Sequence, residues 1–280
     1  MLRIRPLKTT DFLSIIRLTD EEQWGFGTPD LKRMVSLEPK GGLVATMNGR
    51  PIGLTTTIAY GKSVGWIGNV VVDGKHRGAG IGSSLVQSAI RHLLHRHVKT
   101  IALYSYPENE AMYKRLGFDM TGDFARLSMS HGTENSTEQT GRAPLYQILG
   151  LDKRAFGADR SRLLRRLYRE FPKYWAWVTN NAGVSGYSLV KRYQDSSEVG
   201  PLICEETNQE HVAMLVGSSI GLTKKWPLEM SVPESSLTVM EAAMRLGFRV
   251  ERKGVVMSYA TLDPVVINPS VGAFGFLDKG

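Results

Sequence analysis

The sequence predicts an α+β protein of two domains. Three consecutive apolar segments separated by turn residues predict an antiparallel meander in the first half. A glycine-rich stretch then leads from the last of these strands into an amphipathic helix. The second half of the chain repeats parts of the first, beyond a polar stretch typical of a linker. These observations together favour tandem domains that each combine a sheet with helices.

Local patterns predict each element of the first half. Residues 2–6 alternate apolar and basic side chains, which indicates a strand, and residues 9–18 combine capping side chains with helical apolar spacing. Thr28 is the expected cap of a second helix, with Pro29 at its first position. An Asn-Gly hairpin signal at 48–49 separates the first two meander strands. The meander strands are expected at 43–47, 52–60 and 64–72.

The segment 70–83 carries the clearest chemical signal in the chain. Its three valines indicate a buried strand, and Arg-Gly-Ala-Gly-Ile-Gly at 77–82 then opens a helix. Glycines let backbone N–H groups approach an oxyanion closely, and a helix N-terminus adds unpaired donors and the positive end of a dipole. The segment therefore predicts a site for a phosphate or pyrophosphate.

Two common phosphate-binding motifs do not fit this segment. A P-loop requires Lys followed by Ser or Thr after the glycines, and no such pair follows here. The dinucleotide-binding motif requires a third glycine where Ser83 stands. It also requires a carboxylate after the next strand, which is expected at 100–105 and ends without one.

Two motifs instead resemble the GNAT superfamily of N-acetyltransferases. Arg-x-x-Gly-x-Gly, from Arg77 to Gly82, is similar to the superfamily's loop for the pyrophosphate of acetyl-CoA. Further on, Ala-Met-Tyr-Lys-Arg-Leu-Gly-Phe at 111–118 resembles its second signature, a short helix that bears Tyr and closes in Gly-Phe. The resemblance implies an α/β sandwich, with a mixed, mostly antiparallel sheet flanked by helices. It also implies direct acetyl transfer from acetyl-CoA to an amine, without a covalent enzyme intermediate.

The resemblance also implies which residues bind the cofactor. Many members carry Asn seven residues before the Tyr, where this chain has Tyr106, and Asn109 is the candidate substitute. The implied cofactor-binding residues are Val70, Val71, Val72, Arg77, Gly78, Ala79, Gly80, Ile81, Gly82, Ser83 and Asn109.

Two catalytic roles follow from the same resemblance. Tyr113 is expected to protonate the departing thiolate, with a core-packing role as the alternative. The amine must be neutral, which calls for a base or a chain of waters. Glu22 is our candidate base, from a loop of three carboxylates that borders the acceptor side in the superfamily; a structural role for all three stays open. Backbone N–H groups of residues 70–72 are expected to polarise the thioester carbonyl.

Composition restricts the partners and the compartment. The net charge of +8 is spread along the chain, and anionic CoA is a sufficient partner for it, so nucleic-acid binding is not favoured. The single cysteine, Cys204, excludes an internal disulfide and fits a reducing compartment. No apolar run approaches the ~20 residues of a membrane span, and no signal-peptide core precedes the first strand. We therefore expect a cytoplasmic protein without a membrane partner.

Two clusters of side chains have both a functional and a plainer interpretation. His92, His95 and His97 lack a carboxylate or cysteine at ligand spacing, so a solvated helix end is favoured and no metal is expected. The Arg-rich helix at 159–170 is expected to present a solvated face, with recognition of an acidic substrate or a partner as the alternative.

The second half repeats the motifs that close the first. Ser-Tyr-Pro-Glu at 105–108, ahead of Arg-Leu-Gly-Phe, matches Ser-Val-Pro-Glu at 231–234 ahead of the same tetrapeptide. We expect a catalytic, acetyl-CoA-binding domain at 1–131, a linker at 132–143 and a degenerate GNAT-like domain at 144–280. This layout resembles prokaryotic tandem-domain acetyltransferases.

The second copy lacks the residues expected to bind CoA. After Cys204 the chain reads Glu-Glu-Thr-Asn-Gln-Glu, with no glycine before Gly217, and two carboxylates would repel a pyrophosphate. Ala243 stands where the first copy has Tyr113. We interpret this copy as scaffold, pocket wall or homodimer surface.

The predicted function is acetyl-CoA-dependent N-acetylation of a small-molecule amine, because an added domain is expected to narrow the acceptor site. Two alternatives stay open. A protein or peptide N-acetyltransferase needs an open groove, and a non-catalytic acyl-CoA sensor would bind CoA without turnover.

Overall fold

The computed structural model describes residues 1–132, 142–205 and 209–275 of the 280-residue chain. The chain forms two compact units. The first combines Met1–Thr121 with Val256–Val265, and the second combines Gly122–Val255 with a segment that begins at Val266. Most of the expected linker, residues 133–141, lies outside the described residues.

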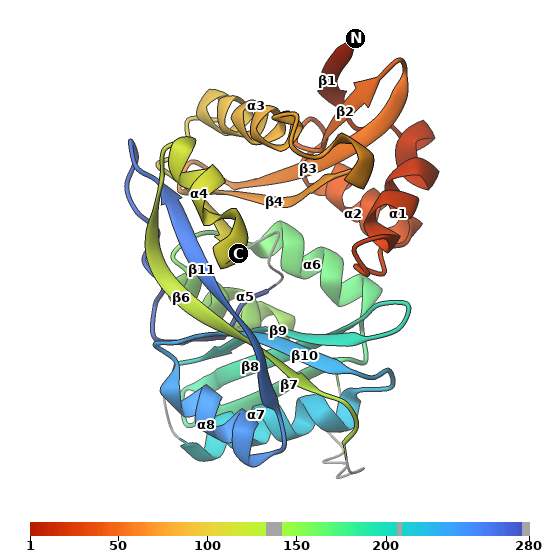
Figure 1. The fold of residues 1–280 in the computed structure, drawn as a ribbon. Coiled ribbons are helices and arrows are strands. Elements are labelled where there is room, and N and C mark those ends of the chain that lie inside the picture. The colour runs from red at the N-terminus through yellow and green to blue at the C-terminus, as the bar shows by residue number, and fades with distance from the viewer. Residues whose placement is uncertain (133–141, 206–208, 276–280) are drawn as a thin grey trace. The chain divides into compact units, whose positions relative to one another are not determined.

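The first unit is a mixed, mostly antiparallel sheet with helices (Figure 1). Strands β1 to β4 pair antiparallel in chain order, and β5 pairs parallel to β4. The elements in chain order are β1 (Leu2–Pro6), α1 (Phe12–Asp20), α2 (Thr28–Leu37), β2 (Leu43–Met47), β3 (Arg50–Tyr60), β4 (Val64–Val72), α3 (Ile81–His95), β5 (Thr100–Ser105) and α4 (Pro107–Arg115). The predicted meander, hairpin and flanking helices are confirmed.

Helices cover both faces of this sheet because successive strand residues point to opposite sides. Leu54 of β3 lies in one buried cluster with residues of α1 and α2. A Cβ on its neighbour Gly53 would instead lie 3.1 Å from Leu85 of α3. The predicted start of α2 needs a small correction: Gly27 is the N-cap, and its N–H donates to Asp30.

Two long strands contribute to both units. β6 (Phe118–Met129) begins in the first unit and continues in the second, and β11 (Arg249–Tyr259) does the reverse. Within the first unit, the Ala260 N–H donates to the Gly117 carbonyl at 2.8 Å, and Thr121 Oγ1 lies 3.1 Å from Ser258 Oγ. The first unit is therefore completed by residues far along the chain.

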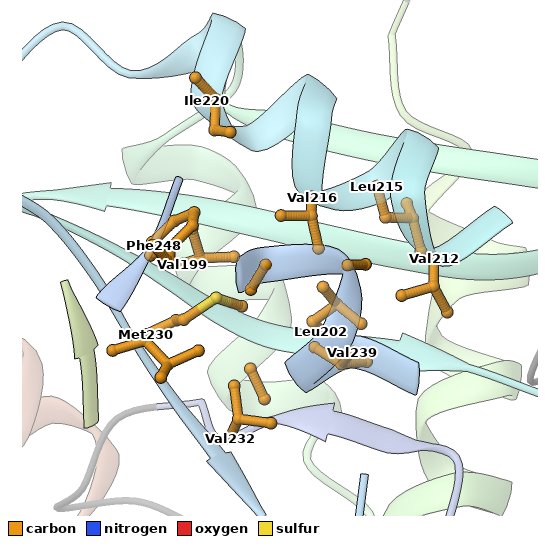
Figure 2. Close-up of a cluster of buried hydrophobic side chains, with 14 of the residues drawn as sticks. Val199, Leu202, Val212, Leu215, Val216, Ile220, Met230, Val232, Val239 and Phe248 are labelled. Atoms are coloured by element: carbon orange, nitrogen blue, oxygen red, sulfur yellow. The ribbon is translucent and has the colours of Figure 1, made fainter. Parts of the chain in front are cut away.

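From α5 onward, the second unit repeats the order of elements that the first unit shows from α1 onward, which confirms the predicted repeat. β7, β8 and β9 pair antiparallel, β10 pairs parallel to β9, and β6 pairs antiparallel to β10. Figure 2 shows its core, in which side chains of α7 and α8 pack on the sheet. The elements are α5 (Leu145–Phe156), α6 (Ser161–Glu170), β7 (Trp175–Asn180), β8 (Gly183–Arg192), β9 (Ser197–Cys204), α7 (Gln209–Leu222), β10 (Leu228–Pro233), α8 (Leu237–Arg245) and β12 (Val271–Ala273).

The Arg-rich segment is only partly solvated. Arg165 and Arg169 are exposed as expected, and the leucines of α6 are buried. Arg160, in contrast, is buried and forms a 2.6 Å ion pair with buried Asp152, which also accepts a 2.6 Å hydrogen bond from the Tyr187 hydroxyl. The solvated interpretation is wrong for Arg160, because its charge is balanced inside the unit.

Among the described helices, none is long and apolar enough to cross a bilayer.

The end of α3 is also less solvated than expected. His95 is exposed, but His92 Nε2 is fully shut off from solvent, 3.5 Å from the carboxylate of buried Glu38. Glu38 also pairs with Arg96 and accepts a hydrogen bond from the Ala59 N–H. Burial opposes ionisation of Glu38, but His92 and Arg96 outweigh it, so the pKa of Glu38 lies below its ordinary value.

The substitution Glu38→Gln is expected to lower the free energy of unfolding by about 1–3 kcal/mol at pH 7, since it leaves buried partners unpaired. A carboxyl group whose pKa is lower in the folded state stabilises the fold above its unfolded pKa. That contribution disappears as the pH falls through the folded pKa. Urea unfolding should therefore show a difference in the free energy of unfolding between wild type and variant. The difference should be full above about pH 5 and should shrink as the pH falls below ~4.3.

Glu21 is exposed, so Glu21→Gln is the control. Its free energy of unfolding should equal that of wild type at every pH. A difference for Glu38→Gln that stays constant down to pH 2 would contradict the role given to the ionised carboxylate.

Candidate active site

The site begins where β4 and β5 stop pairing. Their parallel ladder runs only from Val64 opposite Thr100 to Ile67 opposite Leu103, although β4 continues to Val72. Beyond Ile67, the edge of β4 that faces β5 has no strand partner in the described register. Backbone N–H and C=O groups on such an edge remain available to a ligand.

A bulge in β4 lies within this unpaired stretch. Leu54 pairs with Val71 and Thr56 pairs with Gly68, so β4 holds one residue more than β3 between these pairs. Asn69 has the unusual φ of 52°, and its side-chain amide donates to Thr56 Oγ1 at 2.9 Å. A bulge turns the strand locally and re-aims its groups. Here Val70 and Val72 are half-buried, while Val71 joins the core beneath α1 and α2.

The glycine loop has the backbone that the sequence predicts. Gly78 and Gly80 have φ values of 79° and 75°, a region that favours glycine, and a Cβ on either would meet nothing within 4 Å. Gly80 is the N-cap of α3 and provides no side-chain cap. The first N–H groups of α3 therefore lack partners within the helix, and open space lies over the glycines. This arrangement fits an anion such as a pyrophosphate.

Helix α4 lies against the start of α3. A Cβ on Gly82 would lie 3.7 Å from Met112 Sδ of α4 and 3.8 Å from Val72 Cγ2 of β4. The end of β4, the glycine loop and α4 therefore converge at one place. Tyr113 follows Met112 on the same helix, and its role as the acid stays a prediction.

The Tyr113 ring is buried, with 6% of the side chain exposed, and it packs edge-on against Phe118 at a centroid distance of 6.0 Å. Burial raises the pKa of Tyr113 well above its ordinary value. The ring thus serves packing, and the raised pKa keeps its hydroxyl protonated at neutral pH.

Glu22 and Arg77 form an ion pair with each other. Arg77 Nε also donates to the Val72 carbonyl at 3.0 Å, so this side chain joins the α1–α2 loop to the end of β4. The sequence assigned the two residues to separate tasks, proton acceptance and pyrophosphate binding. In this structure the two charges compensate each other, and the Arg77 contact with one carboxylate oxygen disfavours proton acceptance by Glu22.

The remaining predicted residue, Asn109, lies exposed in the first turn of α4. Its backbone N–H donates to the Tyr106 carbonyl at 3.0 Å, as expected where Tyr106 is the N-cap. Its role in cofactor binding stays a prediction.

The sequence analysis did not identify an aromatic pair that lies beside the point where β4 and β5 stop pairing. Trp66 of β4 stacks on Tyr104 of β5, with ring centroids 4.5 Å apart. The indole Nε1 of Trp66 is fully buried and has no hydrogen-bond partner among the described residues. The sequence shows one aromatic residue in each of these two strands. Their contact can be predicted only when the pairing register of β4 and β5 is known.

Two domain models of acetyltransferases match the chain. Residues 9–118 match the one described as the acetyltransferase (GNAT) family, and residues 148–264 match the one described as an acetyltransferase (GNAT) domain. The first match falls within the first structural unit, whereas the second covers most of the second unit and extends into residues 256–264 of the first. Between them the two matches span most of the chain.

Individual proteins with related sequences are distant. Holothin acyltransferase from Pseudoalteromonas sp. (strain SANK 73390) is 25% identical over 192 residues, which cover 66% of this chain and 63% of that protein, less than two thirds of its length. The uncharacterized N-acetyltransferase YitH from Bacillus subtilis (strain 168) is 21% identical over 259 residues, which cover 90% of this chain and 89% of that protein.

The solved structures agree with the predicted fold. A crystal structure of a candidate acetyltransferase from Pyrococcus horikoshii superimposes with a TM-score of 0.82 at 19% identity, over 100% of this chain and 96% of that chain. At this identity the likeness shows the fold alone. It confirms the predicted α+β architecture of two similar domains.

Proposed function

The chain belongs to the GNAT family of acetyltransferases, and we propose that it transfers an acetyl group from acetyl-CoA to the amine of a small molecule. One observation carries the proposal. The unpaired edge of β4 leads into the open glycine loop at the start of α3, and helix α4, which carries Tyr113, contacts that helix start at Gly82. An anion site, a carbonyl-binding edge and a proton donor are what acyl transfer from a thioester requires.

The residues of the loop and the β4 edge fit acetyl-CoA, which when bound supplies the acetyl group as an activated thioester. Unpaired N–H groups from Gly78 to Ser83 would hold its pyrophosphate, since the space over Gly78 and Gly80 is open. Backbone N–H groups of residues 70–72 would donate to the carbonyl oxygen, where negative charge develops. The raised pKa of Tyr113 keeps the phenol protonated, so that it can donate its proton to the leaving thiolate.

Glu22 is the proposed proton acceptor for the amine. Its partner Arg77 directly precedes Gly78 of the glycine loop, so an anion bound at the loop would compete with Glu22 for the guanidinium. A Glu22 carboxylate released from the pair would accept the amine proton more readily.

Two features support a small acceptor. The α1–α2 loop is held down, because Trp24 and Phe26 pack on the cluster that contains Val71. A loop fixed in this way limits the open groove that a peptide needs. One relative is named for acyl transfer to holothin, which favours a small molecule over a protein for this chain as well.

The test is release of free thiol from acetyl-CoA with a panel of small primary amines and a panel of peptides that carry Lys or a free N-terminus. Release with one or more small amines, and not with the peptides, is the expected result. Release with peptides alone would reassign the acceptor. Calorimetric binding of acetyl-CoA without release on any acceptor would favour a sensor.

A further inference from the structure

In the first unit, the route of a bound acyl-CoA follows from the proposed function. Its pyrophosphate lies at the glycine loop and its thioester lies near Val70, so the arm between them must run along the unpaired edge of β4. That edge is open because β4 and β5 diverge after Ile67 and Leu103. We call this space between the diverging strands the arm channel.

The second unit contains the same divergence. Strands β9 and β10 pair parallel only from Ser197 opposite Leu228 to Val199 opposite Met230. β9 continues to Cys204 and β10 to Pro233 without pairing to each other in the described register. The edges that face the gap would lack partners if nothing lay between them.

The gap in the second unit is filled by a short segment of the chain itself. β12 pairs antiparallel with β9, with Val271 opposite Ile203 and Ala273 opposite Leu202. At one end, the Cys204 N–H donates to the Ser270 carbonyl at 2.9 Å. At the other, the Phe274 N–H donates to the Ser231 carbonyl of β10, also at 2.9 Å. The segment 270–274 thus bonds to both diverging strands.

Side chains fix β12 in this position. Ala273 is fully buried, and the Ser236 hydroxyl donates to the Val271 carbonyl at 2.7 Å. A Cβ on Gly272 would lie 2.5 Å from Leu202 Cδ2 and 2.8 Å from Val239 Cγ2, so any larger residue would force these core side chains to move. Leu202 and Val239 belong to the core cluster of Figure 2.

We propose that β12 is an internal ligand that permanently fills the arm channel of the second unit. Its backbone forms hydrogen bonds with N–H and C=O groups of β9 and β10. The equivalent groups of the first unit stay available to acyl-CoA. The missing glycines remove the pyrophosphate site, and β12 removes the space for the arm. The chain therefore binds one acyl-CoA, and the second unit keeps its fold without one.

Hydrogen exchange and calorimetry on the full chain test this inference. We expect one equivalent of acetyl-CoA, with new protection confined to residues 70–83. The amides of Cys204 and Phe274 should exchange slowly and at the same rate with and without saturating acetyl-CoA. A second equivalent, together with faster exchange at these two amides, would overturn the inference.

The variant Gly272→Leu should displace β12, because its side chain would collide with Leu202 and Val239. Exchange at the Cys204 and Phe274 amides should rise at least ~100-fold. The sole cysteine is buried beside this segment, so its labelling by a thiol reagent should accelerate in parallel. The Kd for acetyl-CoA should stay within about twofold of wild type. Unchanged exchange would contradict the assignment of β12.

Gly217→Leu is the matched control, since a Cβ on that residue of α7 meets nothing within 4 Å. If Gly272→Leu does not fold, Ser236→Ala removes only the bond to Val271 and should speed local exchange about fivefold to tenfold. Exchange at Cys204 no faster than in wild type would then count against the inference. Failure of the chain to bind acetyl-CoA at all would overturn the proposed function, whereas the exchange pattern decides the role of β12 independently.

Discussion

The substitution Gly80→Glu is expected to weaken acetyl-CoA binding by at least ~100-fold in calorimetry. Gly80 ends the loop at the first turn of α3, and the space over it is open. A carboxylate there would occupy the position proposed for the pyrophosphate and place like charges together. Such a contact costs several kcal/mol, and each ~1.4 kcal/mol is a tenfold change in Kd.

The chain offers a closely matched control in Gly61→Glu. Gly61 also has a positive φ, 63°, and a Cβ on it also meets nothing within 4 Å, but it lies in the turn between β3 and β4. Both variants therefore carry the same backbone strain and the same added charge. Gly61→Glu should bind acetyl-CoA as wild type does. Equal losses in both variants would attribute the effect to strain or net charge and contradict the pyrophosphate assignment.

The sequence predicts those features of the first unit that are encoded locally. Alternating residues define the meander, and Asn48 and Gly49 adopt the positive φ values that their hairpin needs. The glycine loop is predictable for the same reason, because Gly78 and Gly80 occupy a backbone region closed to most side chains. In each case a few neighbouring residues determine the conformation.

The exchange of β6 and β11 between the units has no such local signal. The bond from Ala260 to Gly117 and the contact of Thr121 with Ser258 join residues that are far apart in the chain. The residue pattern of β6 or β11 predicts a strand, but it does not indicate which unit each part of the strand belongs to. That depends on which other strands it pairs with. β12 was missed for a related reason: three residues of small or β-branched type are too short a pattern to distinguish from a loop.

The candidate site divides in the same way. The loop and Tyr113 are predicted from motifs that lie within short segments. The pair formed by Glu22 and Arg77 joins residues 55 positions apart, so the sequence could assign each a role but could not show that they neutralise one another. Burial was also invisible to the sequence, and burial is what raises the pKa of Tyr113.

The substitution Tyr113→Phe is expected to lower kcat about 100-fold while the Kd for acetyl-CoA stays within about twofold. The phenyl ring keeps the packing against Phe118, so only the proton donor is lost. The sign of the pH dependence follows from the raised pKa: the phenol is protonated below that pKa, which lies above the ordinary value of ~10. Wild-type kcat should therefore show no alkaline loss from Tyr113 up to about pH 10.

Tyr259→Phe separates loss of the acid from loss of any nearby hydroxyl. The Tyr259 ring also packs on Phe118, with centroids 5.5 Å apart, so the two variants remove one oxygen each from rings that flank the same side chain. Only the Tyr113 hydroxyl lies on the helix that meets the glycine loop at Gly82. Tyr259→Phe should keep kcat within about twofold. An unchanged kcat in Tyr113→Phe would mean that water protonates the thiolate and that the ring serves packing alone.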